Sequence, residues 1–234
     1  MEEKVKYQTE LSKEQEQGNL LIPVVGGSAI LSQVYNEDCV TGMKRYADKY
    51  FDLAVVDPPY GLGEKLVNGG TWAKKLTKND SKWDIKPTDE YWSELWRVSK
   101  NQIIWGGNYY NMPPTRGFIV WDKKLTDNWT MAMAEFAWTS FDQPSKIYRG
   151  LTDNGSRGCE RIHICQKPIK LYEWIYKFYA SEGNLILDTH LGSGSSRIAA
   201  HKAGLSFTGF EIDKEYYEAQ ERRFKIFVSQ GRLW

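Results

Sequence analysis

The chain has 234 residues, of which 41% are hydrophobic and 26% charged, so it can form one sizeable domain with a substantial core. The net charge is +1, so the protein as a whole does not attract a polyanion such as nucleic acid strongly. Any contact with nucleic acid must therefore come from a local basic patch. No apolar run is long enough to cross a bilayer, and the charged start is unlike a secretory signal, so we expect a soluble intracellular protein.

Short apolar runs alternate with amphipathic segments along most of the chain, which is typical of an α/β fold with a mostly parallel sheet. We interpret residues 1–30, polar at first and ending in a Gly-Gly-Ser joint, as an arm on a domain that spans residues 31–234. Strands are predicted at residues 32–36, 52–56, 102–105, 117–121, 134–139, 184–188 and 206–211. Helices are predicted at residues 171–179, 195–201 and 217–227. Residues 61–81 and 142–158 are expected to be long loops.

A glycine-rich turn follows the predicted strand at residues 184–188. Asp188 ends this strand, and Gly192 and Gly194 let the backbone pass close to a ligand before Ser195 opens a helix. Glu211 ends the next predicted strand, where a carboxylate can accept hydrogen bonds from ribose hydroxyls. Together they predict a nucleoside site at the carboxyl ends of neighbouring parallel strands.

The sequence of this turn allows two other interpretations. A dinucleotide fingerprint would continue to a third glycine, where this chain has Arg197, and Asp188 would repel a pyrophosphate. The glycines could also form a plain turn between strand and helix. The acid at the strand end favours a ligand with a cationic end, such as the methionine part of S-adenosylmethionine.

The segment Asp57-Pro58-Pro59-Tyr60 comes directly after a buried strand. Two prolines fix the backbone of a rigid turn, leaving the carbonyls of Asp57 and Pro58 free to accept from a ligand. An exocyclic base amine is a poor nucleophile, and it becomes a better one if two fixed acceptors take its N–H bonds. The Asp57 carboxylate and the Pro58 carbonyl would favour the transition state, because they gain strength as positive charge develops on nitrogen. Tyr60 offers a face on which an extruded base can stack.

At this point the sequence resembles the amino-methylating DNA methyltransferases of the permuted β class. Their D/N/S-P-P-Y/F segment precedes the cofactor-binding glycine segment, as Asp57–Tyr60 precedes the turn here. Further similar segments are Asn36-Glu-Asp38-Cys39, Ile104-Trp-Gly-Gly-Asn108, Phe118-Ile-Val-Trp-Asp-Lys123 and Gln166-Lys167-Pro168. The resemblance covers roughly residues 33–224 and is strongest to compact enzymes of phages, prophages and restriction–modification systems. Leu191 departs from the family's phenylalanine, and Ile164-Cys165 from its Pro-Thr.

The resemblance implies a single Rossmann-like S-adenosylmethionine-dependent methyltransferase domain with helices on both faces and a circularly permuted motif order. It implies site-specific methyl transfer to N6 of a flipped-out adenine, because family members with Asp ahead of Pro-Pro-Tyr tend to act on adenine. The catalytic residues would be Asp57, Pro58, Pro59 and Tyr60. The residues at the S-adenosylmethionine would be Asp38, Cys39, Asp57, Lys167, Asp188, Gly192, Gly194, Ser195 and Glu211. The setting would be the cytoplasm and nucleoid of a bacterial or phage-infected cell.

Double-stranded DNA is the expected partner, read by an insertion at residues 121–161. Basic residues interleaved with aromatics suit phosphate contact and stacking. The candidate DNA contacts are Lys123, Lys124, Lys146, Arg149, Arg157 and Arg161. Because this region is short, we expect a short recognition site or help from a second copy of the chain in a homodimer.

Alternatives to adenine methylation stay open on the sequence. One is a methyltransferase of cytosine N4, or of an RNA or protein amide, although the motif order disfavours the amide-modifying group. Another is a non-catalytic nucleotide- or DNA-binding protein. The three cysteines argue against a disulfide framework, and Cys159, His163 and Cys165 lack a second pair of ligands, so no metal is expected.

Overall fold

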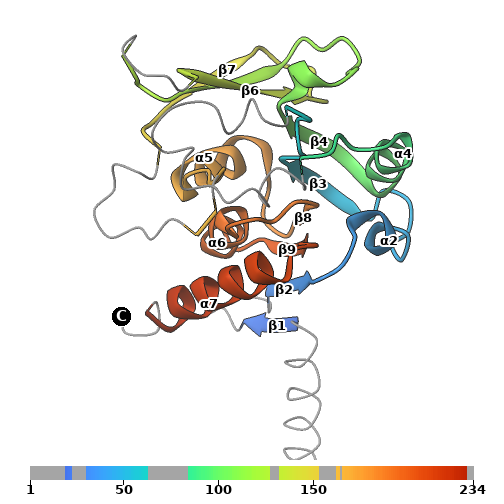
Figure 1. The fold of residues 1–234 in the computed structure, drawn as a ribbon, viewed down its shortest axis with the longest axis vertical. Helices are drawn as coiled ribbons and strands as arrows, with labels where there is room; N and C mark the ends of the chain where they lie inside the picture. Colours follow the sequence, from blue (N-terminus) through green and yellow to red (C-terminus); the bar gives the residue numbers. More distant parts are fainter. Residues whose placement is uncertain are drawn as a thin grey trace, which may run out of the picture.

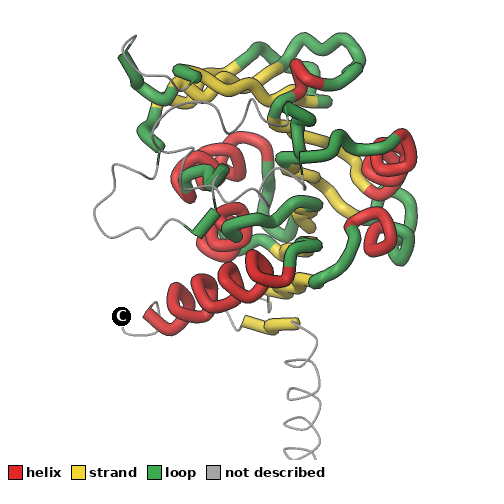
Figure 2. The backbone as a smooth tube through the Cα atoms, viewed as in Figure 1, coloured by secondary structure: helices red, strands yellow, loops and turns green. Residues whose placement is uncertain are grey.

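The computed structural model describes residues 19–22, 30–62, 84–126, 132–152, 162–163 and 165–230. Nine strands in these ranges form one sheet in the order β1-β2-β9-β8-β3-β4-β6-β5-β7 (Figures 1 and 2). The strands are β1 (Asn19–Ile22), β2 (Ile30–Tyr35), β3 (Phe51–Val56), β4 (Ser99–Trp105), β5 (Phe118–Asp122), β6 (Ala134–Thr139), β7 (Lys146–Arg149), β8 (Leu185–Asp188) and β9 (Ser206–Phe210). The helices are α2 (Cys39–Met43), α4 (Asp89–Val98), α5 (Ile169–Tyr179), α6 (Ser195–Lys202) and α7 (Lys214–Gln230), with the short 3-10 helix η2 (Gly107–Tyr109).

The centre of the sheet is parallel. Strands β2, β9, β8, β3 and β4 pair with one another in parallel, and β7 pairs with β5 in parallel. Antiparallel pairing joins β1 to β2 and β6 to both β4 and β5. The predicted α/β fold with a mostly parallel sheet is therefore confirmed.

Strand β3 shows why both faces of the sheet are covered. Leu53 and Val55 pack in a core with residues of α5 and α6, whereas Ala54 and Val56 pack in a core with residues of α2 and α4. Side chains alternate across a strand, so a continuous apolar run needs cover on both sides. Figure 1 shows α5, α6 and α7 on one side of the sheet and α2 and α4 on the other.

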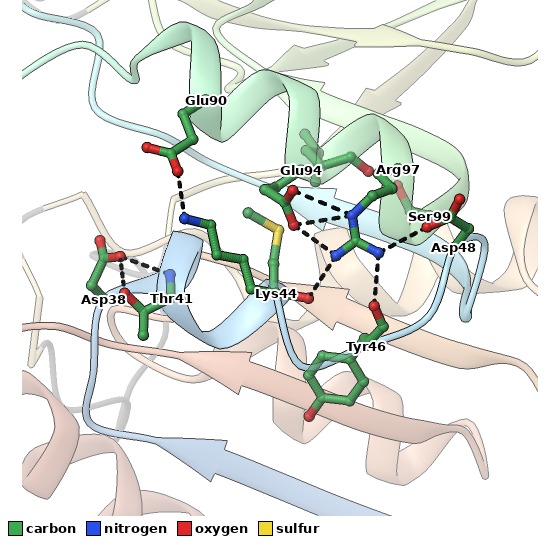
Figure 3. A network of polar contacts seen from close by, with 11 residues as sticks. Asp38, Thr41, Lys44, Tyr46, Asp48, Glu90, Glu94, Arg97 and Ser99 are labelled. Carbon is green, nitrogen blue, oxygen red and sulfur yellow. Dashed lines mark hydrogen bonds and ion pairs between the residues drawn. The ribbon is translucent and has the colours of Figure 1, made fainter.

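Arg97 joins α4 to the loop that follows α2 (Figure 3). Its guanidinium donates to the carbonyls of Tyr46 at 2.8 Å and Met43 at 3.1 Å, and it pairs with Glu94 at 2.7 Å. Helix α4 begins where the Thr88 side chain accepts from the backbone N–H of Tyr91. These bonds fix α2, and with it the segment that enters the site from β2.

All seven predicted strands and all three predicted helices are present, with ends shifted by a few residues. The prediction of a loop over residues 142–158 was wrong at β7, a four-residue strand that gains its hydrogen bonds only by pairing with β5. Helices α2 and α4 were not predicted from apolar spacing. The predicted arm lies outside the described residues except for β1, and the predicted loop at residues 61–81 does so beyond residue 62.

None of the described helices is long and apolar enough to cross a membrane.

Candidate active site

The polar residues expected at the site follow neighbouring parallel strands. Asp57 comes after β3, Asp188 ends β8, Glu211 follows β9, and Asp38 lies between β2 and α2. The carboxyl ends of parallel strands meet at one edge of a sheet, which is where ligands bind in such folds. The electrostatics agree: burial raises the pKa of Asp188 to about 7, with smaller contributions from the charges of Asp57 and Glu211. The sequence-predicted acids are therefore neighbours.

The glycine turn adopts the backbone that its sequence predicts. Gly192 has φ +51° and Gly194 has φ +69°, both in the left-handed region that favours glycine. The N–H of Gly192 donates to Glu211 Oε2 at 2.8 Å, which ties the turn to the end of β9. Ser195 opens α6 and is buried, with its hydroxyl 3.0 Å from both Ser193 Oγ and a nitrogen of Arg223.

Asp188 and Glu211 make this part of the site negative. Asp188 accepts from the backbone N–H of His190 at 3.1 Å and from the Ser196 hydroxyl. Glu211 accepts from the N–H of Asp213 at 2.9 Å, and burial raises its pKa. Within the described ranges neither acid has an ion-pair partner, so the site is suited to a cationic ligand.

Asp38 and Cys39 form the start of α2 beside this acidic region. Asp38 accepts from the N–H of Thr41 at 2.9 Å and so caps the helix (Figure 3). Burial raises the pKa of the Cys39 thiol to about 12, and the charges of Asp38 and Glu211 add smaller effects in the same direction. Cys39 is therefore a neutral, partly buried thiol beside the acidic region.

His190 lies in the same region, although sequence reasoning did not include it. Burial lowers its pKa to about 4, so the ring is neutral at physiological pH. Its ring is 5.4 Å from that of Tyr91, whose hydroxyl lies 2.8 Å from Thr189 Oγ1. The one sequence signal that could have placed His190 in the site is its position two residues after Asp188.

The Asp57–Tyr60 turn is held by internal hydrogen bonds. The Tyr60 hydroxyl donates to Asp57 Oδ1 at 2.7 Å, and the Tyr110 hydroxyl donates to the Pro58 carbonyl at 2.7 Å. The Pro58 carbonyl, which was predicted to be free for a ligand, thus already accepts from Tyr110 with one of its two lone pairs. The second lone pair is still available to a ligand.

The ring of Tyr60 is stacked in this structure. Its centroid lies 4.7 Å from that of Tyr109, with 19° between the planes. A Cβ placed on Gly106 would come within 2.2 Å of the same ring, so Gly106 leaves the space that Tyr60 fills. Tyr109 is exposed, and it covers the face of the Tyr60 ring on which a planar ligand could stack.

Lys167 contacts the acidic head of the turn. Its side chain is 4% exposed, and its ammonium pairs with Asp57 Oδ2 and, at 3.2 Å, with Glu135 Oε2. Its Nζ also lies 5.2 Å from the centre of the Trp105 ring. The two carboxylates outweigh the effect of burial and raise the pKa of Lys167. The ammonium is thus on the Asp57 side of the site, and sequence reasoning did not identify its second partner, Glu135.

Residues 108–222 match the DNA methylase family of N6/N4 amino-methyltransferases. This part of the chain, together with the curated relatives described next, makes the chain similar to N6/N4 DNA methylases. The matched residues contain Asp188, the glycine turn and Glu211, and begin after Asp57. The resemblance to amino-methylating DNA methyltransferases is confirmed.

Curated relatives and solved structures agree with this assignment. The chain is 26% identical to the type II methyltransferase M.HpaI of Haemophilus parainfluenzae, over 80% of this chain and 72% of that protein. It is 22% identical to the type II methyltransferase M2.MboI of Moraxella bovis, over 82% and 86% of the two chains.

Among solved structures, the chain is similar to the cytosine-N4-specific PvuII DNA methyltransferase, with a TM-score of 0.58 and 14% identity over 82% of this chain and 86% of that one. It is also similar to M1.HpyAVI in its SAM complex, with a TM-score of 0.54 and 18% identity over 82% and 98% of the chains. The predicted methyltransferase fold is thereby confirmed. The circularly permuted motif order stays a prediction.

The candidate DNA contacts of this chain do not share one environment. Lys123 is 5% exposed and its ammonium pairs with Glu135 at 2.6 Å, so we correct its assignment: it is a buried ion-pair residue. Lys124 and Arg149 are exposed, and Arg149 lies 3.6 Å from Asp122. Lys146 is partly exposed on β7, with its ammonium 5.1 Å from the Phe178 ring. Arg157 and Arg161 lie outside the described residues.

His163 and Cys165, which were considered as metal ligands, have other contacts. The His163 ring lies 4.3 Å from the Tyr216 ring, and His163 Nδ1 accepts from the backbone N–H of Cys165 at 3.2 Å. Cys165 is an exposed free thiol. No group of three or more metal-ligating side chains occurs in the described part of the chain, while Cys159 lies outside it.

Proposed function

We propose that this chain is a site-specific DNA methyltransferase that methylates N6 of an adenine flipped out of the duplex, with S-adenosylmethionine as methyl donor. The observation that carries the proposal is the position of Asp57 at the end of β3, next to the acidic glycine turn at the ends of β8 and β9. A methyl acceptor and its donor need adjacent sites of this kind, and residues 108–222 match a DNA methylase family.

The residues around the turn fit the proposed donor. Bound S-adenosylmethionine supplies an electrophilic methyl group on a cationic sulfur. Asp188 and Glu211 would hold its cationic and ribose parts, because both are buried acids without an ion-pair partner among the described residues. Asp38 and Cys39 would lie at the adenine edge, and Gly192 and Gly194 leave room for close backbone approach.

Asp57 and the Pro58 carbonyl would act on the target amine. Asp57 accepts one N–H and the remaining lone pair of the Pro58 carbonyl accepts the other, so the nitrogen lone pair turns away from the ring. Both acceptors form stronger hydrogen bonds as the nitrogen gains positive charge. They therefore stabilise the transition state more than the bound substrate, and this lowers the barrier to methyl transfer. Tyr60 would stack on the flipped base once Tyr109 moves off its ring.

The choice of base is the finer part of the proposal. Asp at the head of the Pro-Pro-Tyr segment favours adenine N6 within this family. Cytosine N4 is the second candidate, because the similar PvuII enzyme is cytosine-N4-specific. Both bases present an exocyclic amine, and the acceptors Asp57 and Pro58 suit either.

The DNA would meet the protein on the side of residues 121–161. Lys124, Lys146 and Arg149 are the described candidates that reach solvent there. We expect them to contact phosphates in the cytoplasm of a bacterial or phage-infected cell, with a second copy of the chain contributing if the recognition site is long.

Labelled S-adenosylmethionine and genomic DNA test the function directly. We expect labelled N6-methyladenine in a fixed flanking sequence, identified by mass spectrometry and sequencing. N4-methylcytosine would support the second candidate, and no label in DNA would contradict the proposal.

The Asp57→Ala variant tests the mechanism. Loss of the acceptor should lower the single-turnover rate by about a hundredfold or more, while affinity for S-adenosylmethionine stays within about twofold. Glu218→Ala is the control, since this carboxylate is 51% exposed on α7 in a surface pair with Lys214, away from residues 121–161. Full activity of the Asp57 variant would refute the mechanism.

A further inference from the structure

Four charged side chains form a continuous row that starts at the catalytic turn. Asp57 contacts Lys167, Lys167 contacts Glu135 Oε2 at 3.2 Å, and Glu135 Oε1 contacts Lys123 at 2.6 Å. The charges alternate in sign along the row. The two ammonium groups are buried, at 4% and 6% side-chain exposure for Lys167 and Lys123.

The row is rigidly supported. Each lysine lies over an indole ring, Lys167 at 5.2 Å from Trp105 and Lys123 at 5.1 Å from Trp121. Glu135 is fixed by the sheet, because its backbone is paired with that of Trp121 in the β5–β6 register. Burial raises the pKa of Glu135, but the two ammonium groups outweigh this and the net pKa is lowered, so Glu135 is an anion at neutral pH.

This arrangement poses a problem for the proposed reaction. An ammonium in contact with Asp57 weakens the attraction between that carboxylate and an amine that gains positive charge. The contact cannot simply be abandoned, because an unpaired buried ammonium is strongly disfavoured. Lys167 therefore needs a second anion within reach, and Glu135 is that anion.

We propose that Glu135 is a positioning residue for methyl transfer: it takes over the Lys167 ammonium when the target amine binds, which releases Asp57 to accept the amine. The inference rests on the proposed function and assigns a role to an acid outside the motif segments. Lys123 holds the far oxygen of Glu135 in place, so its near oxygen can take the Lys167 ammonium, and the charge of Asp57 is balanced by the positive charge that develops on the amine.

The test compares Glu135→Gln, the double variant Lys167→Met/Glu135→Gln and wild type in single-turnover methyl transfer at saturating S-adenosylmethionine. Glu135→Gln leaves Lys167 with Asp57 as its only ion-pair partner among the described residues, so the rate should fall by about tenfold or more. The double variant removes the ammonium too, and we expect it to regain most of that loss. A merely structural role for Glu135 would make the double variant worse.

Asp52→Asn is the matched control: its carboxylate is 24% exposed, close to the 25% of Glu135, and it pairs with Lys100 at the end of β3 away from Asp57. Its rate should equal that of wild type. S-adenosylmethionine affinity and circular dichroism are measured for each variant, because Lys167 is also an expected cofactor contact. If Glu135→Gln does not fold, the double variant carries the test, and a folded double variant that binds S-adenosylmethionine but has no activity overturns the inference.

Two results would separate this inference from the proposed function. An active wild type with an equally active Glu135→Gln variant overturns the role of Glu135 alone. A wild type that transfers no methyl group to DNA overturns both.

Discussion

At the scale of single residues, Asp188 accepts structural hydrogen bonds and is also a proposed contact of S-adenosylmethionine. Its carboxyl group is buried, and its pKa is raised from 3.8 to about 7, chiefly by burial. A cationic ligand favours the ionised form, so affinity for S-adenosylmethionine should weaken as the pH falls below about 7. The affinity should fall by at most about tenfold per pH unit, because a single proton on Asp188 competes with the ligand.

Calorimetry at pH 8, 7 and 6 measures this effect. The variant Asp188→Asn should bind more weakly at pH 8 and lose most of the pH dependence. The stability of the free protein should change with pH in the opposite direction. Between pH 3.8 and about 7 the folded state binds the proton of Asp188 more tightly than the unfolded state does. The contribution of Asp188 to the free energy of unfolding therefore decreases as the pH rises. A pH-independent affinity in wild type would contradict the role of Asp188.

The acids of the site could be predicted from the sequence, because each follows a strand within a short local motif. Glu135 and Tyr110 could not, since their contacts with Lys167 and Pro58 join segments far apart in the chain. Lys123 was assigned to the DNA surface because a lysine in a polar region is usually solvated. Its inward position depends on the pairing of β5 with β6.

At the scale of elements, the end of β4 shapes the catalytic turn. Gly106 has φ +67° and faces the Tyr60 ring. Gly106→Ala should lower the free energy of unfolding by about 1 kcal/mol, because alanine is strained in this left-handed backbone conformation. It should also displace Tyr60 and so lower the rate of methyl transfer by about a hundredfold. Thermal unfolding and single-turnover kinetics measure the two effects.

Gly204→Ala is the control for this substitution. Gly204 has φ +70°, and a Cβ there would meet nothing within 4 Å. Both variants should lose the backbone contribution, Gly106→Ala should lose more stability because its Cβ also displaces Tyr60, and only Gly106→Ala should lose activity. Equal activity in both would show that the position of Tyr60 does not limit the reaction.

Helices α5, α6 and α7 could be predicted because their apolar residues recur at helical spacing over two or more turns. Helix α4 was missed although Thr88 caps it, since Trp92 and Trp96 lie outside the stripe of Tyr91, Leu95 and Val98 and blur its period. The five residues of α2 and the four of β7 are too few to show a period at all.

At the scale of the whole molecule, Arg197 links the sheet to the helices beside it. In the sequence it was noted only as the residue that breaks a dinucleotide fingerprint. In the structure it is 1% exposed and donates to Ser32 of β2 at 2.9 Å and to Gln220 of α7 at 3.1 Å. It also pairs with Glu221 and lies 3.9 Å from the centre of the Phe224 ring. One side chain thus joins β2, α6 and α7.

Arg197→Ala should reduce the free energy of unfolding by about 3 kcal/mol or more, because it leaves Glu221 and Ser32 without their buried partner. Arg222→Ala, which removes a 68% exposed partner 3.9 Å from Glu218, should cost less than about 1 kcal/mol. Urea denaturation of both variants measures the difference. Since Arg197 also sits one turn after the glycine segment on α6, the destabilised variant should bind S-adenosylmethionine more weakly than the Arg222 variant does. Equal stability losses in the two variants would mean that α7 is held by its apolar contacts alone.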